Sequence, residues 1–411
     1  MRDTIFPQRL GPQFRLLAGA SWASNLGDGI AMAAGPLLVA SLTPDPFLVS
    51  TAALLQWAPP LVLGLYAGAL SDRLDRRRIV LAANAVRVAV LAGLIATVVT
   101  GTVTIAVALL ALGLLATAEV FADNTTSTLA PMLVHRADLA VANARIQAGL
   151  VTLNHLAGPA VGAALFATGR AWPFAAQAVL LGAAVLLVAR IVLPPVHSGE
   201  TSRGMYHDVV EGVRWTVRHP AVRTLSLTVL VFNVAFGAAW SVLVLYASRQ
   251  LGLGSFGFGL LTTASAVGGL LGTVLYGRIT RYVSLGNLMR IGLITETLTH
   301  LCLALTASPW VAGTILFLFG VHEFVWGTTA VTIRQRAVPT HLQGRVASVS
   351  TICVFGGLVV GAPIGGALAD RWDVTTPFWF AFAGSALLTV LLWRQFTLIA
   401  HDDESAGAAQ P

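Results

Sequence analysis

The sequence contains no lysine, so all 25 of its basic residues are arginines and lysine-based chemistry is excluded. Charged residues of both signs make up only 10% of the 411 residues, compared with about 25% in an average soluble domain. Hydrophobic residues account for 56% of the chain. This balance argues against a water-soluble protein and favours a chain embedded in lipid.

Motifs of catalysis and of nucleotide binding are also absent from the sequence. It has no GxxxxGKS or GxxxxGKT phosphate loop, so ATP-driven transport is unsupported, and it has no GxSxG elbow. The segment HEFVW (322–326) lacks the second histidine of a zinc-protease helix. The two cysteines, Cys302 and Cys353, lie within apolar runs, which does not favour a disulfide or a metal site. We therefore expect no enzymatic activity, no cofactor and no bound metal.

Long apolar segments recur along the whole chain. A membrane-spanning helix needs roughly 20 mostly apolar residues, and charge clusters and turns divide the chain into twelve such segments. The sequence therefore predicts an all-α membrane protein with twelve transmembrane helices in two pseudo-symmetric six-helix bundles. The segments are approximately 14–41, 47–71, 79–100, 102–124, 140–168, 172–193, 222–248, 256–279, 286–306, 310–333, 344–369 and 375–398.

The longest hydrophilic interval, 194–220, falls near the midpoint of the chain. We interpret it as a cytoplasmic linker that contains a short amphipathic helix around Tyr206–Arg218. The linker would separate an N-terminal bundle (1–193) from a C-terminal bundle (221–398), which a cytoplasmic tail (399–411) follows.

The arginines sort to one side of the predicted membrane. With the N-terminus in the cytoplasm, 21 of the 25 fall on the cytoplasmic side. Arg170, Arg249 and Arg371 fall on the far side, and Arg87 lies inside a span. The positive-inside rule favours this orientation, so we expect a multi-pass protein of the cell membrane with both termini in the cytoplasm. The rule also accounts for the net charge of +7 without a nucleic-acid partner.

The two halves of the sequence resemble each other. Several features recur at a separation of 204 residues, which indicates duplication of a six-helix unit. Duplicated bundles are typical of transporters with a site near the membrane midplane between the repeats. The pairs are Gly68 with Gly272, Pro159 with Pro363, Pro173 with Pro377, and Arg190 with Arg394.

The segment GLYAGALSDRLDRRRIV (64–80) concentrates charge between two apolar runs. It resembles the signature loop between helices two and three of the major facilitator superfamily. Gly68, Asp72 and Arg73 match the first part of that signature, and Arg76 and Arg77 match the basic residues that close it. Position 75, where the family usually has glycine, is an aspartate. We expect the turn to survive there because aspartate tolerates left-handed backbone geometry better than most residues.

A gating role for this loop follows from the resemblance. Gly68 would let helix two approach a neighbour closely, and Asp72 would favour the positive N-terminus of another helix. The resemblance implies that this helix is the eleventh, near His341–Arg345. Arg76 and Arg77 would pair with Asp123 at the cytoplasmic end of helix four, and such contacts would hold the halves together in the outward-open state. The alternative is that the arginines only anchor the topology.

Further likeness is to the efflux branch of the superfamily that includes macrolide exporters and enterobactin-type siderophore exporters. It rests on SNLGDG (Ser24–Gly29), PMLVHRADLAVANA (Pro131–Ala144) and RQRAVPTHLQGRVAS (Arg334–Ser348). It implies export of small molecules.

The segment GPAVG, with Gly158, Pro159 and Gly162, is similar to the antiporter motif of drug–proton exchangers. Ala163 replaces the last glycine of that motif, and the arginine that many such exchangers carry in helix four is missing. Close packing of small residues is the alternative explanation.

Ionisable residues within apolar spans mark function by default. Asn25 and Asp28 share one face of helix one, and we interpret this face as a cavity wall. Because burial favours the protonated form of a carboxyl group, Asp28 is predicted to exchange the coupling proton, and a buried structural hydrogen bond is the alternative. Glu119 is a second candidate for coupling. Arg87 is expected to neutralise a nearby acid.

Two further groups of residues complete the candidate site. Glu296 and His300 are spaced i, i+4 on helix nine and can share a proton, whereas the adjacent His322 and Glu323 on helix ten point to different faces. The aromatic candidates for a substrate surface are Phe236 and Trp240, with Phe232, Phe324 and Trp326, and packing against lipid is the alternative for each.

The sequence thus predicts a monomeric secondary active transporter in a lipid bilayer that exports amphipathic small molecules in exchange for protons. An importer or facilitator of the same fold is the first alternative, and a polytopic membrane enzyme is the second. The cargo is left open among a macrolide, a siderophore and a toxic metabolite.

Overall fold

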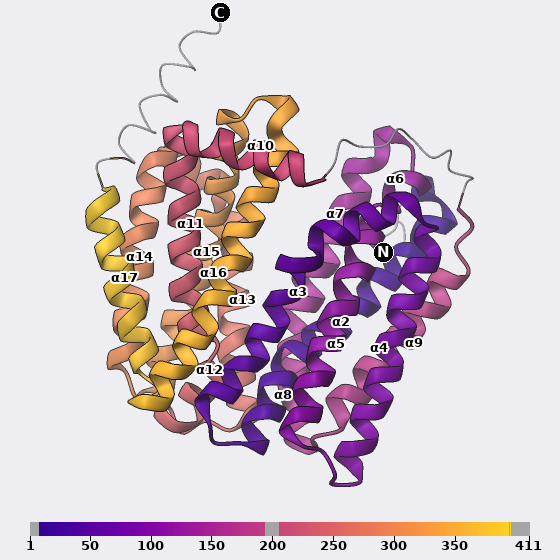
Figure 1. Ribbon diagram of the computed structural model, residues 1–411, viewed down its shortest axis with the longest axis horizontal. Helices are drawn as coiled ribbons and strands as arrows, with labels where there is room; N and C mark the ends of the chain where they lie inside the picture. Colours follow the sequence, from indigo (N-terminus) through magenta and orange to yellow (C-terminus); the bar gives the residue numbers. More distant parts are fainter. Residues whose placement is uncertain (1–7, 194–204, 394, 396–411) are drawn as a thin grey trace, which may run out of the picture. The chain divides into compact units, whose positions relative to one another are not determined.

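The computed structural model describes residues 8–193, 205–393 and 395, without the side chains of Gln8, Leu65, Ala69, Asp72, Arg73 and residues 205–208. Every regular element in these ranges is a helix (Figure 1). Eleven helical segments are long and apolar enough to cross a membrane, and the shorter apolar helix α17 (Thr376–Leu392) follows them. Each of the twelve predicted segments overlaps one of these, so the all-α membrane fold is confirmed.

The chain divides into two compact units. The first contains the described residues of Met1–Pro44, Leu55–Ser202 and Gly254–Thr263, and the second contains those of Asp45–Leu54, Arg203–Leu253 and Ala264–Pro411. The long helices of the first half are α2 (Gly11–Leu42), α3 (Pro46–Arg73), α4 (Arg76–Val99), α5 (Ile105–Ser127), α7 (Leu139–Gly149), α8 (Gly158–Thr168) and α9 (Trp172–Ala189), and a π-helical segment, η3 (Leu150–Ala157), joins α7 to α8.

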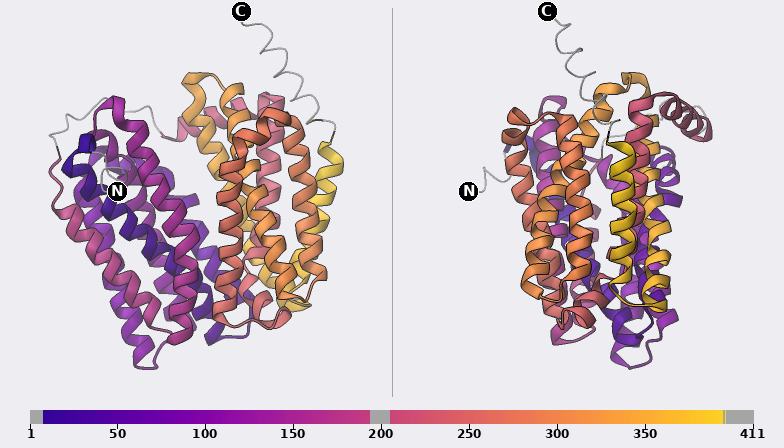
Figure 2. Two further views of the ribbon diagram at one scale, coloured as in Figure 1. Left: turned by 180° about the vertical axis from the view of Figure 1, so that it is seen from behind. Right: turned by 90° about the vertical axis from the view of Figure 1, so that its left-hand side faces the viewer.

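The second half begins with α10 (Met205–Arg218), at the place of the predicted amphipathic helix, and α10 packs across the ends of α11 (Pro220–Trp240) and α16 (Gln343–Arg371) (Figures 1 and 2). The other long helices of this half are α13 (Ser255–Tyr282), α14 (Leu285–Leu305), α15 (Pro309–Ala337) and α17. The short elements of the chain are η1 (Gln8–Leu10), α6 (Ala130–Leu133), η2 (Arg136–Asp138), α12 (Leu243–Leu245), η4 (Tyr246–Gln250) and η5 (Thr340–Leu342).

Side-chain caps fix where α4 and α14 begin. The Asp75 carboxylate accepts hydrogen bonds from the backbone N–H groups of Arg77 (3.0 Å) and Arg78 (3.3 Å), and Ser284 Oγ accepts one from Asn287 N–H at 3.4 Å. Aspartate and serine are preferred at this position because they satisfy N–H groups that have no partner inside the helix. The left-handed turn expected at Asp75 is wrong, because Asp75 has a φ of −61° and acts as a helix cap.

Glycines bring the helices of each unit into close contact. In the second unit, a Cβ atom at Gly237 would lie 2.7 Å from the carbonyl oxygen of Leu358, and one at Gly357 would lie 2.6 Å from that of Leu230. Gly361 likewise contacts the backbone of α11. Small residues allow helix backbones to approach this closely, so α11 and α16 form a tightly packed pair.

Candidate functional site

Arg87 of α4 is the centre of a buried polar cluster in the first unit. Its side chain is 0% exposed. The guanidinium pairs closely with the carboxylate of Asp28 on α2, lies 3.6 Å from Glu119 Oε2 on α5 and donates to Asn84 Oδ1 at 3.2 Å. A charge is tolerated in an apolar interior when it is paired and hydrogen-bonded. The prediction that Arg87 neutralises a nearby acid is confirmed, and the acids are Asp28 and Glu119.

Asp28 and Glu119 differ in how far they are enclosed. The Asp28 side chain is 5% exposed and also accepts hydrogen bonds from Ser24 Oγ (3.2 Å) and Gln177 Nε2 (3.5 Å). The Glu119 side chain is 36% exposed. The structure therefore places Asp28 behind the surface of the unit, not on an open wall, and Glu119 is the more accessible partner of Arg87.

Two neighbours complete the surroundings of this cluster. Asn25, half-buried one turn before Asp28, donates to the Ser21 carbonyl oxygen at 2.8 Å. Asp123, exposed one turn after Glu119, interacts electrostatically with Arg87 and Asp28. Asp123 thus adds a third acidic group near the two that pair with Arg87, and together the three carry more negative charge than Arg87 balances when all of them are ionised.

The glycines of the GPAVG segment pack directly on α2 beside Asp28. A Cβ atom at Gly158 would lie 2.5 Å from the Cα of Gly29, and one at Gly162 would overlap the carbonyl oxygen of Ile30. Pro159 is buried in the first turn of α8, directly after the π-helical segment. A proline has no N–H for the regular helical bond, which is consistent with the change of helix type there. This segment therefore sets the position of Asp28.

The loop of the predicted gate is described only in part, since the side chains of Asp72 and Arg73 lie outside the description. Arg76 Nε donates to the carbonyl oxygen of Ser71 at 3.1 Å, and its Nη1 lies 3.2 Å from Met132 Sδ. Arg77 donates to the carbonyl oxygen of Ala189. The structure thus brings these arginines to α6 and to the end of α9.

The close approach expected at Gly68 stays a prediction. A Cβ atom there would meet no described atom within 4 Å, so no described side chain or backbone of its own unit packs against this glycine.

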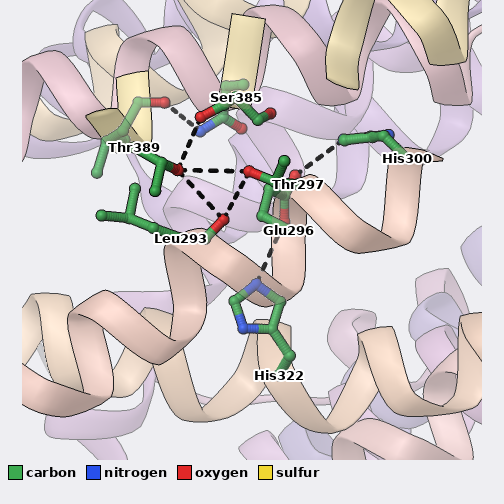
Figure 3. A network of polar contacts seen from close by, with 9 residues as sticks. Leu293, Glu296, Thr297, His300, His322, Ser385 and Thr389 are labelled. Atoms are coloured by element: carbon green, nitrogen blue, oxygen red, sulfur yellow. Dashed lines mark hydrogen bonds and ion pairs between the residues drawn. The ribbon is translucent and has the colours of Figure 1, made fainter. Parts of the chain in front are cut away.

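A second polar cluster lies in the other unit and centres on Glu296 of α14 (Figure 3). Its two carboxylate oxygens bind different histidines: Oε1 lies 3.1 Å from His300 Nε2, and Oε2 lies 3.2 Å from His322 Nε2 on α15. The side chains of Glu296, His300 and His322 are 6%, 0% and 9% exposed. The spacing of Glu296 and His300 predicts their contact, but His322 is 26 residues away along the chain and no sequence pattern identifies it as a partner.

Aromatic rings pack against this histidine pair. Phe236 and Trp240 stack at 4.2 Å between ring centroids, and Phe319 lies 4.8 Å from Trp240. The Trp240 ring meets His300 edge-on at 5.9 Å, and Phe319 meets His322 at the same distance. The structure therefore brings two of the predicted aromatic residues together with Phe319. The sequence does not single out Phe319, because a phenylalanine in an apolar helix carries no distinguishing signal.

The remaining aromatic candidates separate from this group. Phe232 and Trp326 form a pair of their own at 5.4 Å between ring centroids. Glu323, the neighbour of His322, is exposed, which agrees with the expectation that the two residues face different ways.

The chain is similar in sequence to known membrane transporters. A family model described as transmembrane secretion effector matches residues 6–410. The multidrug efflux pump Tap of Mycolicibacterium fortuitum is 27% identical over 88% of this chain and 90% of its own. The enterobactin exporter EntS of Salmonella typhimurium is 25% identical over 87% of this chain and 86% of its own.

Solved structures with the same fold include transporters of different kinds. The nucleoside transporter NupG aligns with a TM-score of 0.72 at 12% identity, over 95% of this chain and 99% of its own. A bacterial homologue of the iron transporter ferroportin, in an inward-facing state, aligns with a TM-score of 0.74 at 16% identity, over 93% and 98%. At this level of identity the likeness shows the fold alone.

Proposed function

We propose that this chain, which belongs to the transmembrane secretion effector family of major facilitator superfamily transporters, exports amphipathic small molecules in exchange for protons. The family makes the chain a multi-pass membrane transporter and not an enzyme. Export is supported by relatives that are themselves named as an efflux pump and as an exporter.

The observation that carries proton coupling is the unequal exposure of the two carboxylates that share Arg87. Asp28 is enclosed, whereas Glu119 is 36% exposed. Neighbouring carboxylates disfavour each other's ionisation, so the cluster is suited to hold a proton on Glu119 or Asp28. Binding of that proton leaves Arg87 with fewer anionic partners and changes the attraction among α2, α4 and α5.

We assign the other candidate residues to supporting roles in the same cycle. The half-buried residues Asn25, Phe236 and Trp240 would contact an amphipathic cargo, because they offer one amide and two aromatic faces. Glu296 would contribute a second buried carboxylate. The segment that includes Gly158 would hold α2 in place while the charges around Asp28 change.

The loop from Gly68 to Arg77 would act as the cytoplasmic gate, with Asp72, Arg73 and Arg76 as its polar residues and Asp123 as an acidic partner. The proposal also includes two six-helix bundles (1–193 and 221–398), both termini in the cytoplasm of a bacterial cell, and function as a monomer. The positive-inside distribution of arginines supports this orientation.

Transport by the purified full-length chain in proteoliposomes tests the proposal. Ethidium serves as a cationic probe and erythromycin as a macrolide probe, and a proton gradient is imposed across the vesicle membrane. An exchanger moves at least one probe into the acidic compartment against its concentration gradient. Movement only down the probe's own gradient would indicate a facilitator, and movement together with protons would indicate an importer.

Glu119→Gln in the same assay tests the assignment of the acid. We expect this variant to lose gradient-driven accumulation, because an amide cannot exchange a proton. Asp370→Asn, which removes an exposed acid of α16 in the other unit, is the matched control.

A further inference from the structure

The buried cluster of Glu296, His300 and His322 differs in chemistry from the Arg87 cluster of the first unit. An arginine stays protonated in proteins, whereas a histidine changes charge near physiological pH. Here one buried carboxylate binds the Nε2 atoms of two imidazoles at 3.1 Å and 3.2 Å. The group can therefore exist in more than one protonation state without any change of partners.

We propose that these three residues form a second proton-binding site, in which His322 gains and loses the proton while His300 stays neutral. The site goes beyond the proposed function, since it concerns proton binding by the second unit whatever cargo the protein carries and in whichever direction.

The neutral state of His300 follows from its surroundings. Its side chain is 0% exposed, and its Nδ1 atom is buried without a hydrogen-bond partner among the described residues. A charged imidazole carries N–H donors on both ring nitrogens, and a buried donor without a partner is costly. The neutral ring instead donates its one N–H, on Nε2, to Glu296 Oε1 and leaves only a lone pair unpaired.

His322 is the member of the group that a proton can reach. Its side chain is the most exposed of the three at 9%. The next residue, Glu323, is exposed and interacts electrostatically with both His322 and Glu296. A proton accepted by His322 therefore lies beside one carboxylate and near a second, and both stabilise the imidazolium.

Other titratable groups around the cluster are few. The packed helix α17 contains none, and α11 contains only Arg223, in its first turn. On α14 itself, Arg290 lies near the other end and contacts the Trp393 carbonyl oxygen. Tyr246 of η4 donates its phenol O–H to the carbonyl oxygen of Leu303, at 2.7 Å, about one turn beyond His300. The described polar neighbours also include Cys302, an exposed thiol two residues after His300, and the indole N–H of Trp326, which lies beside His322. The hydroxyls of Thr297, Ser385 and Thr389 lie nearby (Figure 3).

Proton binding changes the charge of the group by one. With His322 charged, the imidazolium and the Glu296 carboxylate cancel, and with His322 neutral the carboxylate remains as an unbalanced charge held by two N–H donors. The rings of Trp240 and Phe319 lie against the two histidines. The rings of Trp240 and Phe319 are therefore in direct contact with the group whose charge changes.

Nuclear magnetic resonance of the full-length protein in lipid nanodiscs, with ¹⁵N-labelled histidine, tests the proposal without any cargo. The ¹⁵N shifts separate neutral from charged imidazoles, and His300→Gln and His322→Gln identify the two signals. We expect the His322 signal to change to that of an imidazolium as the pH is lowered. The His300 signal should stay that of a neutral ring protonated on Nε2.

Two variants complete the design. Glu296→Gln should abolish the His322 imidazolium signal at the pH at which the wild type shows it, because the variant lacks the carboxylate that stabilises the charged ring. His341→Gln, which changes an exposed histidine of η5, should leave both signals unchanged. A charged His300, or a His322 that stays neutral at every pH measured, would overturn the proposal. If Glu296→Gln does not fold, the wild-type spectrum alone still distinguishes these outcomes. Transport without proton coupling would overturn the proposed function and leave this site intact.

Discussion

Arg87 and Glu296 occupy equivalent positions in the two units. Arg87 lies twelve residues after Asp75, which caps α4, and Glu296 lies twelve residues after Ser284, which caps α14. Each side chain is buried and binds two ionisable partners. The charge is inverted between them: a cation binds two acids in the first unit, and an acid binds two histidines in the second.

Removal of the cation should destabilise the first unit strongly. Arg87→Gln leaves the Asp28 carboxylate buried without its charged partner, and breaking a buried ion pair in this way costs about 3–5 kcal/mol. Denaturant titration of the protein in detergent micelles measures the loss. Arg78→Gln, at an exposed arginine of the same helix, should change the free energy of unfolding by no more than about 0.5 kcal/mol.

The double variant Arg87→Gln with Asp28→Asn should recover most of that stability, because it removes both buried charges. If the double variant were as unstable as Arg87→Gln alone, the pairing of these two residues would not be the source of the effect.

Gly158→Ala should disturb the contact that positions Asp28. The added methyl group would lie 2.5 Å from the Cα of Gly29, so the helices must separate, at a cost of about 1–3 kcal/mol. Thermal unfolding and probe transport should both decline. Gly182→Ala on α9, where a Cβ meets no described atom within 4 Å, is the control, and equal effects of the two changes would contradict the packing argument.

Asp75→Ala should weaken the start of α4. It removes the acceptor of two backbone N–H groups, and loss of such a cap costs about 0.5–2 kcal/mol. Asp75→Ser keeps a capping oxygen and should retain most of the stability in the same unfolding measurement. If Asp75→Gly matched the wild type while Asp75→Ser did not, the residue would serve turn geometry and not capping.

Asp28→Asn tests whether the enclosed acid takes part in coupling. An amide cannot bind the proton, so accumulation of ethidium or erythromycin driven by a proton gradient should disappear, while exchange of probe across the membrane without a gradient should continue. Accumulation at the wild-type level would restrict Asp28 to a structural role as the partner of Arg87.

The repeat in the sequence does not by itself identify which glycines are equivalent in the two halves. The sequence pairs Gly68 with Gly272, which lie 204 residues apart. Counted from the helix caps Asp75 and Ser284, however, Gly277 is the residue that corresponds to Gly68, because each lies seven residues before its cap. The described contacts agree with the second pairing. A Cβ at Gly68 or at Gly277 would meet no described atom within 4 Å, whereas one at Gly272 would lie 2.8 Å from the Val321 carbonyl oxygen. Glycines are frequent in membrane helices, so matching them by a single offset does not identify equivalent positions.

The sequence by itself determined that the chain is a membrane protein of about twelve helices, because length and hydrophobicity are local properties that no distant contact alters. It also identified Arg87, Asp28, Glu119 and Glu296 as ionisable residues within spans. Only the tertiary structure decided their partners: Asp28 with Arg87, and His322 with Glu296. These helices are apolar on most faces, so the sequence does not encode how each one is rotated about its axis, and that rotation is what brings distant side chains together.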